Sequence, residues 1–180
     1  MPITEPIPEK SKKGSDSLAD NFLRFYFSFI YPNNSLIKGG SIDTLFHQHG
    51  QILQQLVAKA YKETTIEFIS QASLDGLIPH FEQMGRWWGK EKDTDVEIDL
   101  VGFNEREDSI LVVETKWTTK SVGTEILADL KRKSQFLDWK KSGRKEYYSL
   151  VAKGGFTDEL IKKAKQENIL LVHEDKILQF

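Results

Sequence analysis

The chain has 180 residues, 39% of them hydrophobic and 29% charged, with a formal net charge of −2, as is typical of a single globular domain. It contains no cysteine, which excludes disulfide bonds, thiol nucleophiles and zinc–cysteine sites and suits a reducing, cytoplasmic location. The longest apolar run, residues 22–31, is short and carries Arg24, so we expect no membrane-spanning segment.

The N-terminal part of the chain is predicted to be helical after a short tail. Residues 1–15 are rich in proline and lysine and have little to bury, so they are predicted to form a flexible tail or linker. Residues 16–180 are predicted to form one domain, with helices over 16–63 and a mixed-sheet core over 64–180.

The first helix is expected to run to about Tyr31 from a cap at Asp16 or Asp20. Its aromatic residues recur at i, i+3, i+4 and i+7, a stripe typical of core packing or of a domain interface: Phe22, Phe25, Tyr26 and Phe29. Two further helices are predicted, over residues 43–63 and 66–77.

Strand patterns begin after residue 94. Residues 95–101 alternate strictly between polar and apolar side chains, and residues 110–117 are rich in β-branched side chains, so the two segments are predicted to form a hairpin. The remaining predicted elements are a helix over 121–141, a strand over 147–152, a helix from Thr157 to about 167 and a strand over 169–172. This order predicts an α/β fold with a mixed sheet.

The near-zero net charge conceals two charged blocks. Residues 91–114 contain nine acidic and two basic residues, whereas residues 116–145 contain nine basic and three acidic ones. An acidic block beside a basic block is typical of a metal-dependent enzyme that acts on a polyanion. Two solvated faces that offset each other are the alternative.

The register of the hairpin decides whether the acidic residues converge. A two-residue loop at Arg106 and Glu107 places Asp99 directly opposite Glu114, and opposed residues have Cβ atoms about 4.5–5.5 Å apart. Strand alternation then puts Lys116 on the face of Glu114, and Glu97 on that of Asp99. An odd-numbered loop would turn Glu114 to the opposite face.

Such a pair of carboxylates suits Mg²⁺ or Mn²⁺, which prefer oxygen ligands. A bound ion could polarise a phosphoryl oxygen and acidify water, and Lys116 could orient the attacking water or stabilise developing charge. The alternative is a solvated hairpin face on which Glu114 and Lys116 form a surface ion pair of little energetic value. Lys133 or Gln135, on the basic helix, could reach the site.

Several short segments resemble a known family. These are Asp20–Phe25, Tyr31–Asn33, Gly85–Gly89, Glu97–Val101, Glu114–Trp117 and Gly155–Thr157. In this order they resemble the uncharacterised C-terminal domain of archaeal-type P-loop ATPases, which is itself similar to the PD-(D/E)xK restriction-endonuclease-like superfamily. The resemblance covers roughly residues 16–175 and implies an αβββαβ core with additional N-terminal helices.

The resemblance also implies roles for individual residues. Asp99, Glu114 and Lys116 occupy the metal-binding and catalytic positions, and the Thr115 carbonyl is a further expected metal ligand. Gln54 stands where the family pattern has a glutamate, so this chain departs from the family at that position. A neutral amide keeps a ligand oxygen but lacks the charge.

The chain contains no G-x-x-x-x-G-K-[ST] motif, so the ATPase of the family is missing from it. We therefore expect a fragment, a truncated product or a split partner of a P-loop ATPase, acting in cis or in trans. The resemblance implies a Mg²⁺-dependent nuclease-like domain acting on nucleic acid. The alternatives are a catalytically inactive domain that binds nucleic acid or protein and, more remotely, a defence or toxin–antitoxin component.

Overall fold

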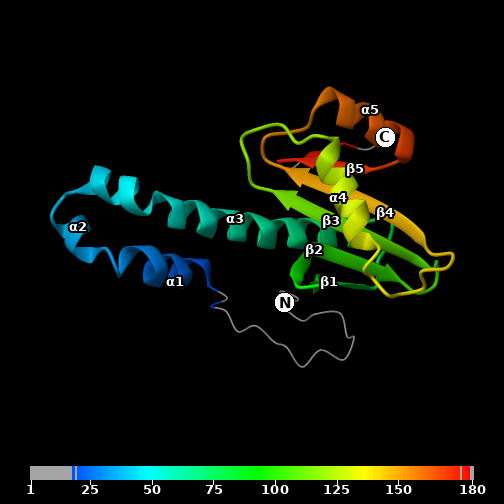
Figure 1. The fold of residues 1–180 in the computed structure, drawn as a ribbon, viewed down its shortest axis with the longest axis horizontal. Helices are drawn as coiled ribbons and strands as arrows, with labels where there is room; N and C mark the ends of the chain where they lie inside the picture. The colour runs from blue at the N-terminus through cyan, green and yellow to red at the C-terminus, as the bar shows by residue number, and fades with distance from the viewer. Residues whose placement is uncertain (1–17, 19, 175, 179–180) are drawn as a thin grey trace. The chain divides into compact units, whose positions relative to one another are not determined.

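The computed structural model describes Leu18, residues 20–174 and residues 176–178, which form a mixed α/β protein (Figure 1). The predicted tail over residues 1–15 lies outside the described residues. Contacts divide the chain into two compact units, Lys13–Thr64 and a larger one that contains Thr65–Phe180. The predicted α/β class with a mixed sheet is confirmed.

The N-terminal unit is helical, and its first helix begins where the sequence predicts. The Asp20 carboxylate caps it by accepting a hydrogen bond of 2.8 Å from the Leu23 backbone N–H. The predicted single helix changes to π-helical geometry half-way, and a short helix follows that the sequence did not predict. The helices are α1 (Asn21–Phe25), η1 (Tyr26–Ile30), α2 (Asn34–Lys38) and α3 (Ile42–Leu74), of which the part from Thr65 onward belongs to the larger unit.

Helix α3 is continuous, so the prediction of two helices over 43–63 and 66–77 is wrong. The predicted break contains only Thr64 and Thr65, whose β-branched side chains lower helix propensity slightly but do not end a helix. The helix ends before Gly76, which has φ 73°. Glycine adopts this left-handed geometry without strain and is the usual residue there.

The aromatic stripe of the first helix is only partly buried. Phe29 is 2% exposed and contacts the Phe46 ring at a centroid distance of 6.2 Å, whereas Phe22 is 68% exposed. An ion pair of 3.1 Å between Arg24 and Glu63 joins the first helix to α3. The expectation of core packing therefore holds for Phe29 and not for Phe22.

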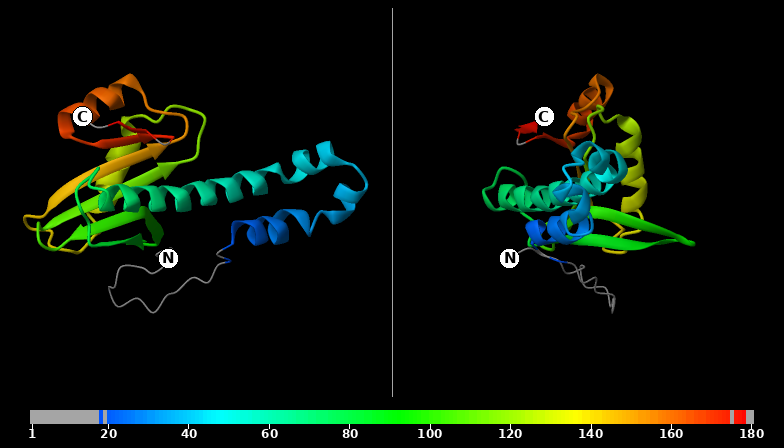
Figure 2. Two further views of the ribbon diagram at one scale, coloured as in Figure 1. Left: turned by 180° about the vertical axis from the view of Figure 1, so that it is seen from behind. Right: turned by 90° about the vertical axis from the view of Figure 1, so that its left-hand side faces the viewer.

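The larger unit is built on one six-stranded sheet in the order β1-β2-β3-β4-β5-β6 (Figure 2). The first three strands are antiparallel, β3, β4 and β5 are parallel, and β6 is antiparallel to β5. Their bounds are β1 (Gln83–Glu91), β2 (Thr94–Asn104), β3 (Ser109–Lys116), β4 (Lys145–Ala152), β5 (Leu170–His173) and β6 (Lys176–Leu178).

The sequence did not predict β1 or β6. Strand β1 lacks polar–apolar alternation and contains Gly85 and Gly89, residues that are depleted in strands. The ring of Trp87 lies over Gly89, where an added Cβ would be 2.5 Å from the ring. The glycine is therefore needed for close packing, and a local pattern does not reveal this requirement.

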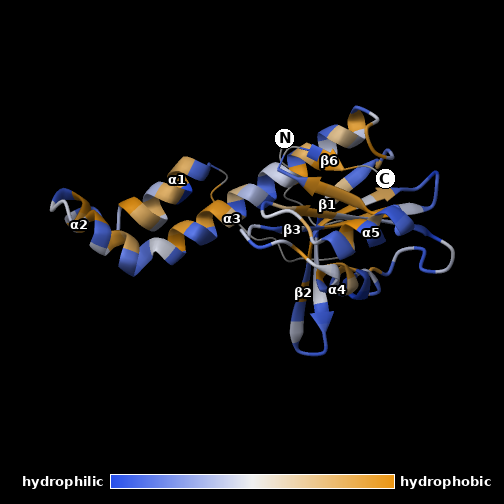
Figure 3. Ribbon diagram, turned by 90° about the horizontal axis from the view of Figure 1, so that it is seen from above, coloured by the Kyte–Doolittle hydropathy of each residue, from blue (hydrophilic) through white to orange (hydrophobic). Residues whose placement is uncertain are grey.

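Helices α4 (Thr124–Ser134) and α5 (Asp158–Glu167) pack on the sheet and enclose the core with it. Leu127 and Leu130 of α4, together with Leu160 and Ala164 of α5, are fully buried. The exposed end of the β1–β2 hairpin, by contrast, is hydrophilic (Figure 3). No helix in the described part of the chain has the length and apolarity needed to cross a bilayer.

Helix α4 is shorter than the predicted 121–141. Before it, Val122 forms a parallel bridge with Phe156, and after it the chain turns. Arg144 donates hydrogen bonds of 2.7–2.9 Å to the carbonyl oxygens of Ser134, Leu137 and Trp139. Carbonyls at a helix end need partners outside the helix, and this arginine supplies them.

Candidate active site

The predicted hairpin register is confirmed, although the turn is longer than expected. The turn contains four residues, 105–108, and the strands pair from Asn104 opposite Ser109 to Leu100 opposite Val113. The even number of residues preserves the register, so the next opposed pair would be Asp99 and Glu114. The ladder stops one step earlier, and β3 continues alongside β4 alone.

Asp99 lies at the point where β2 and β3 separate. Its carboxylate accepts a hydrogen bond of 2.8 Å from the Thr115 backbone N–H, in place of a partner from the ladder. The β1–β2 register also shifts here, because Asp99 and Leu100 of β2 lie opposite Arg86 of β1. Such bulges re-aim side chains and are frequent beside active sites. Asp99 is only 3% exposed.

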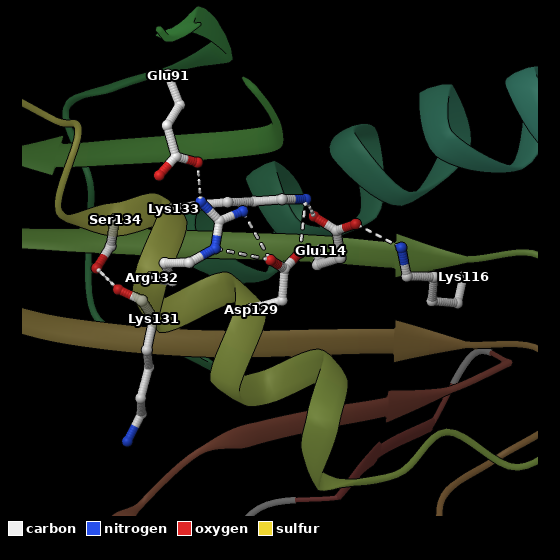
Figure 4. A network of polar contacts seen from close by, with 8 residues as sticks. All are labelled: Glu91, Glu114, Lys116, Asp129, Lys131, Arg132, Lys133 and Ser134. Atoms are coloured by element: carbon white, nitrogen blue, oxygen red, sulfur yellow. Dashed lines mark hydrogen bonds and ion pairs between the residues drawn. The ribbon is translucent and has the colours of Figure 1, made fainter. Parts of the chain in front are cut away.

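Glu114 is held by two lysines (Figure 4). Its Oε1 lies 2.6 Å from Lys116 Nζ, and its Oε2 lies 3.1 Å from Lys133 Nζ. The Glu114 side chain is 7% exposed, that of Lys133 is 15% exposed and that of Lys116 is 36% exposed. Lys116 thus reaches both a buried carboxylate and solvent, and Lys133 neutralises the same carboxylate from α4.

Asp129 of α4 extends this network, although no sequence motif marks it. Its carboxylate lies 2.9 Å from Arg132 and 3.4 Å from Lys133, and Arg132 also pairs with Glu91 of β1. Partial burial acts to raise the pKa of Asp129, but hydrogen bonds to Arg132 and the charge of Lys133 outweigh it and lower that pKa. The i, i+4 spacing of Asp129 and Lys133 was the available signal.

A second polar network fixes α4 on the sheet. The hydroxyls of Ser134 and Tyr148 lie 2.9 Å apart, and Tyr148 also donates a hydrogen bond to Glu146. The Arg144 side chain is 2% exposed and pairs with Glu146 at 2.7 Å. These contacts join the end of α4 to β4 and so position Lys133, the residue before Ser134.

Tyr148 is expected to ionise later than an ordinary tyrosine. Burial and the hydrogen bond to Glu146 raise the pKa of Tyr148 to about 12. The unfolded chain loses this proton near pH 10, so we expect the contribution to stability to be complete below pH 10 and lost between about pH 10 and 12. Absorbance titration should show a late component from Tyr148. Tyr148→Phe should remove that component; its persistence would contradict the assignment.

The other predicted accessory residues are Glu97, Gln135 and Gln54. Glu97 pairs with Arg86 on β1, and the bulge interrupts the alternation that was expected to align it with Asp99. Gln135 donates to the Ser134 hydroxyl at 3.3 Å. Gln54 is exposed on α3 within the Lys13–Thr64 unit, whereas Asp99 and Glu114 belong to the larger unit.

The donor set fits a hard divalent cation. Asp99 and Glu114 provide buried carboxylate oxygens from neighbouring strands, and such oxygens are the ligands that Mg²⁺ and Mn²⁺ prefer. Two ammonium groups already compensate the negative charge of Glu114, so a divalent cation would have to displace at least one of them. Within the described residues, no group of three or more acidic or histidine side chains is arranged to hold a metal.

The two charged blocks of the sequence pair with each other. Bases of residues 116–145 contact acids of residues 91–114 in four ion pairs, Lys116–Glu114, Lys133–Glu114, Arg132–Glu91 and Lys140–Asp108. Much of the basic block is therefore directed toward the acidic block of the same domain.

Comparison with known proteins places the chain in a family. Residues 26–131 match the model of DUF234, described as archaea bacterial proteins of unknown function. The chain belongs to this family. It is 36% identical over 159 residues to the "Uncharacterized protein MJECL04" of Methanocaldococcus jannaschii. That match covers 84% of this chain and 33% of the relative, so the chain spans about a third of the relative's length. No solved structure matches.

Proposed function

We propose that this DUF234 chain is a Mg²⁺-dependent phosphodiesterase domain that cleaves nucleic acid on a restriction-endonuclease-like core. One observation carries the proposal. Asp99 and Glu114 are buried on neighbouring strands at the point where β2 and β3 separate, and Lys116 contacts Glu114. The element order α3–β1–β2–β3–α4–β4 supports it, since this is the αβββαβ order that the resemblance implies.

The contacts of each residue are compatible with a role in this proposed reaction. Asp99 and Glu114, with the Thr115 carbonyl, would hold the divalent cation. When bound, the ion supplies Lewis-acid polarisation of a phosphoryl oxygen and lowers the pKa of water. The hydrogen bond from the Thr115 N–H keeps the Asp99 carboxylate in place. Lys116 is partly exposed, so its ammonium can orient the attacking water or stabilise charge that develops on the phosphate.

A catalytically inactive domain that binds nucleic acid or protein is the second candidate. The ion pairs of Glu114 with two lysines favour it, because this carboxylate is already neutralised. The amide at Gln54, where the family pattern has a glutamate, favours it as well. In either case we infer that the partner is a P-loop ATPase module in cis or in trans, for which the longer relative leaves room.

A cleavage assay separates the two candidates. The purified protein is incubated with supercoiled plasmid and with single- and double-stranded DNA and RNA oligonucleotides, in Mg²⁺, Mn²⁺ or EDTA. We expect cleavage in the presence of either ion and none in EDTA. Cleavage that persists in EDTA, or binding to a substrate without cleavage under any condition, would contradict the nuclease proposal; the second result would support the binding domain.

A further inference from the structure

Lys133 places a cation between two carboxylates of the candidate site. Its Nζ lies 3.1 Å from Glu114 Oε2 and 3.4 Å from Asp129 Oδ2 (Figure 4). The Lys133 side chain is only 15% exposed, whereas Asp129 is 45% exposed. One end of this arrangement is therefore buried at Glu114, and the other opens toward solvent at Asp129.

The ammonium remains charged in this position. Burial acts to lower the pKa of Lys133, but the charges of Glu114 and Asp129 and the hydrogen bonds to them outweigh it, and the pKa is raised. A buried ammonium is tolerated only when it is paired in this way. Lys133 therefore supplies positive charge at the same carboxylate that the proposed catalytic ion needs.

We propose that Lys133 is an internal counter-cation, which occupies Glu114 in the ion-free protein and leaves it when a divalent cation binds. The inference rests on the proposed function only in taking this ion to be the catalytic one. Glu114 Oε2 cannot keep an ammonium at 3.1 Å and also bind a divalent ion without close repulsion between the two cations. The ion and Lys133 thus compete for one carboxylate.

Asp129 gives the displaced side chain a second position. It lies four residues before Lys133 on α4, where side chains share a face, and Lys133 already contacts it. Lys133 can therefore release Glu114 and retain Asp129 through a change of its own rotamers. The ammonium is then closer to solvent, where a substrate phosphate oxygen can accept a hydrogen bond from it.

Competition of this kind lowers the apparent affinity for the ion, because only the fraction of molecules with Lys133 displaced can bind it. Removing the ammonium should therefore tighten binding. We expect the Kd for Mn²⁺, measured by calorimetry on EDTA-treated protein, to fall about tenfold in Lys133→Met. This is the change expected if Lys133 is displaced from Glu114 in about one tenth of the ion-free wild-type molecules. Lys133→Gln, which keeps a hydrogen-bond donor near Glu114, should show the same direction.

Matched variants locate the effect. Lys131→Met on the same helix removes an ammonium that pairs with Glu167, and we expect its Kd to equal that of the wild type. Adding Asp99→Asn to Lys133→Met should abolish the gain, because it removes one of the two carboxylates. Circular dichroism of each variant reports whether the fold is retained.

The inference is overturned if the Kd for Mn²⁺ of both Lys133 variants equals or exceeds that of the wild type. It is also overturned if neither the wild type nor either variant binds Mn²⁺. The first result is distinct from failure of the proposed function. Tighter Mn²⁺ binding without cleavage would refute the nuclease and support the counter-cation. Metal-dependent cleavage with unchanged Mn²⁺ affinity in the variants would support the nuclease and refute the counter-cation.

Discussion

Asp99→Asn is expected to lower the rate of metal-dependent cleavage by about 10³-fold, the upper range for loss of one preorganised electrostatic group in an active site. The asparagine has nearly the same shape, and its carbonyl oxygen can still accept the hydrogen bond from the Thr115 N–H. The substitution therefore removes a charge from a buried position while the separation of β2 and β3 is retained. Single-turnover cleavage in Mg²⁺ measures the effect.

A matched substitution on the same strand provides the control. Asp95 of β2 is exposed and pairs in register with Lys90 at the far end of the β1–β2 hairpin, so Asp95→Asn should cleave at the wild-type rate. Both variants should melt within a few degrees of the wild type. Equal cleavage by Asp99→Asn and the wild type would show that the activity does not depend on this carboxylate.

Arg144→Met is expected to destabilise the protein by about 3–5 kcal/mol, the range found when one partner of a buried ion pair is removed. The Arg144 side chain is 2% exposed, pairs with Glu146 and donates to three carbonyl oxygens at and beyond the end of α4. Methionine has similar length but leaves these acceptors without their donor. Urea unfolding followed by circular dichroism gives the free energy.

Arg132→Met is the matched control for this prediction. Arg132 also forms two ion pairs, with Glu91 and Asp129, but its side chain is 47% exposed. Exposed ion pairs contribute little, so we expect the free energy of unfolding to equal that of the wild type within experimental error. If the two variants lost equal stability, burial of Arg144 would not explain its contribution, and the anchoring of α4 through Arg144 would be wrong.

The sequence predicted the hairpin register because that register follows from local rules. Strict alternation over residues 95–101 and an even number of turn residues are enough to predict the pairing from Asn104–Ser109 to Leu100–Val113, even though the turn has four residues and not two. The ladder ends one step before Asp99 and Glu114. The cap at Asp20 was predictable for the same reason, since a capping side chain bonds to its own helix.

Features that depend on distant residues were missed. Strand β1 depends on packing of Trp87 over Gly89 and on pairing with β2, so its own sequence shows no strand pattern. The early end of α4 depends on Arg144, ten residues further along the chain. Alternation also predicted Glu97 beside Asp99, but the register shift at Arg86 redirects it.

The charge of the site also depends on contacts between residues that are distant in the sequence. The sequence shows an acidic block and a basic block, from which a phosphate-binding surface is a reasonable expectation. In the fold, four of those bases pair with residues of the acidic block, and two of the four neutralise Glu114. Only the packing of α4 against β3 shows that Lys133 forms an ion pair with the Glu114 carboxylate and is not simply part of a basic surface.

A crystal structure of the protein soaked in Mn²⁺, with anomalous scattering used to locate the ion, tests the proposed metal site directly. We predict an anomalous peak bound by the carboxylates of Asp99 and Glu114, with Lys133 moved from Glu114 toward Asp129. A protein that binds no Mn²⁺ at these carboxylates, with Lys116 and Lys133 still paired to Glu114, would contradict the central claim that this pair is a metal site.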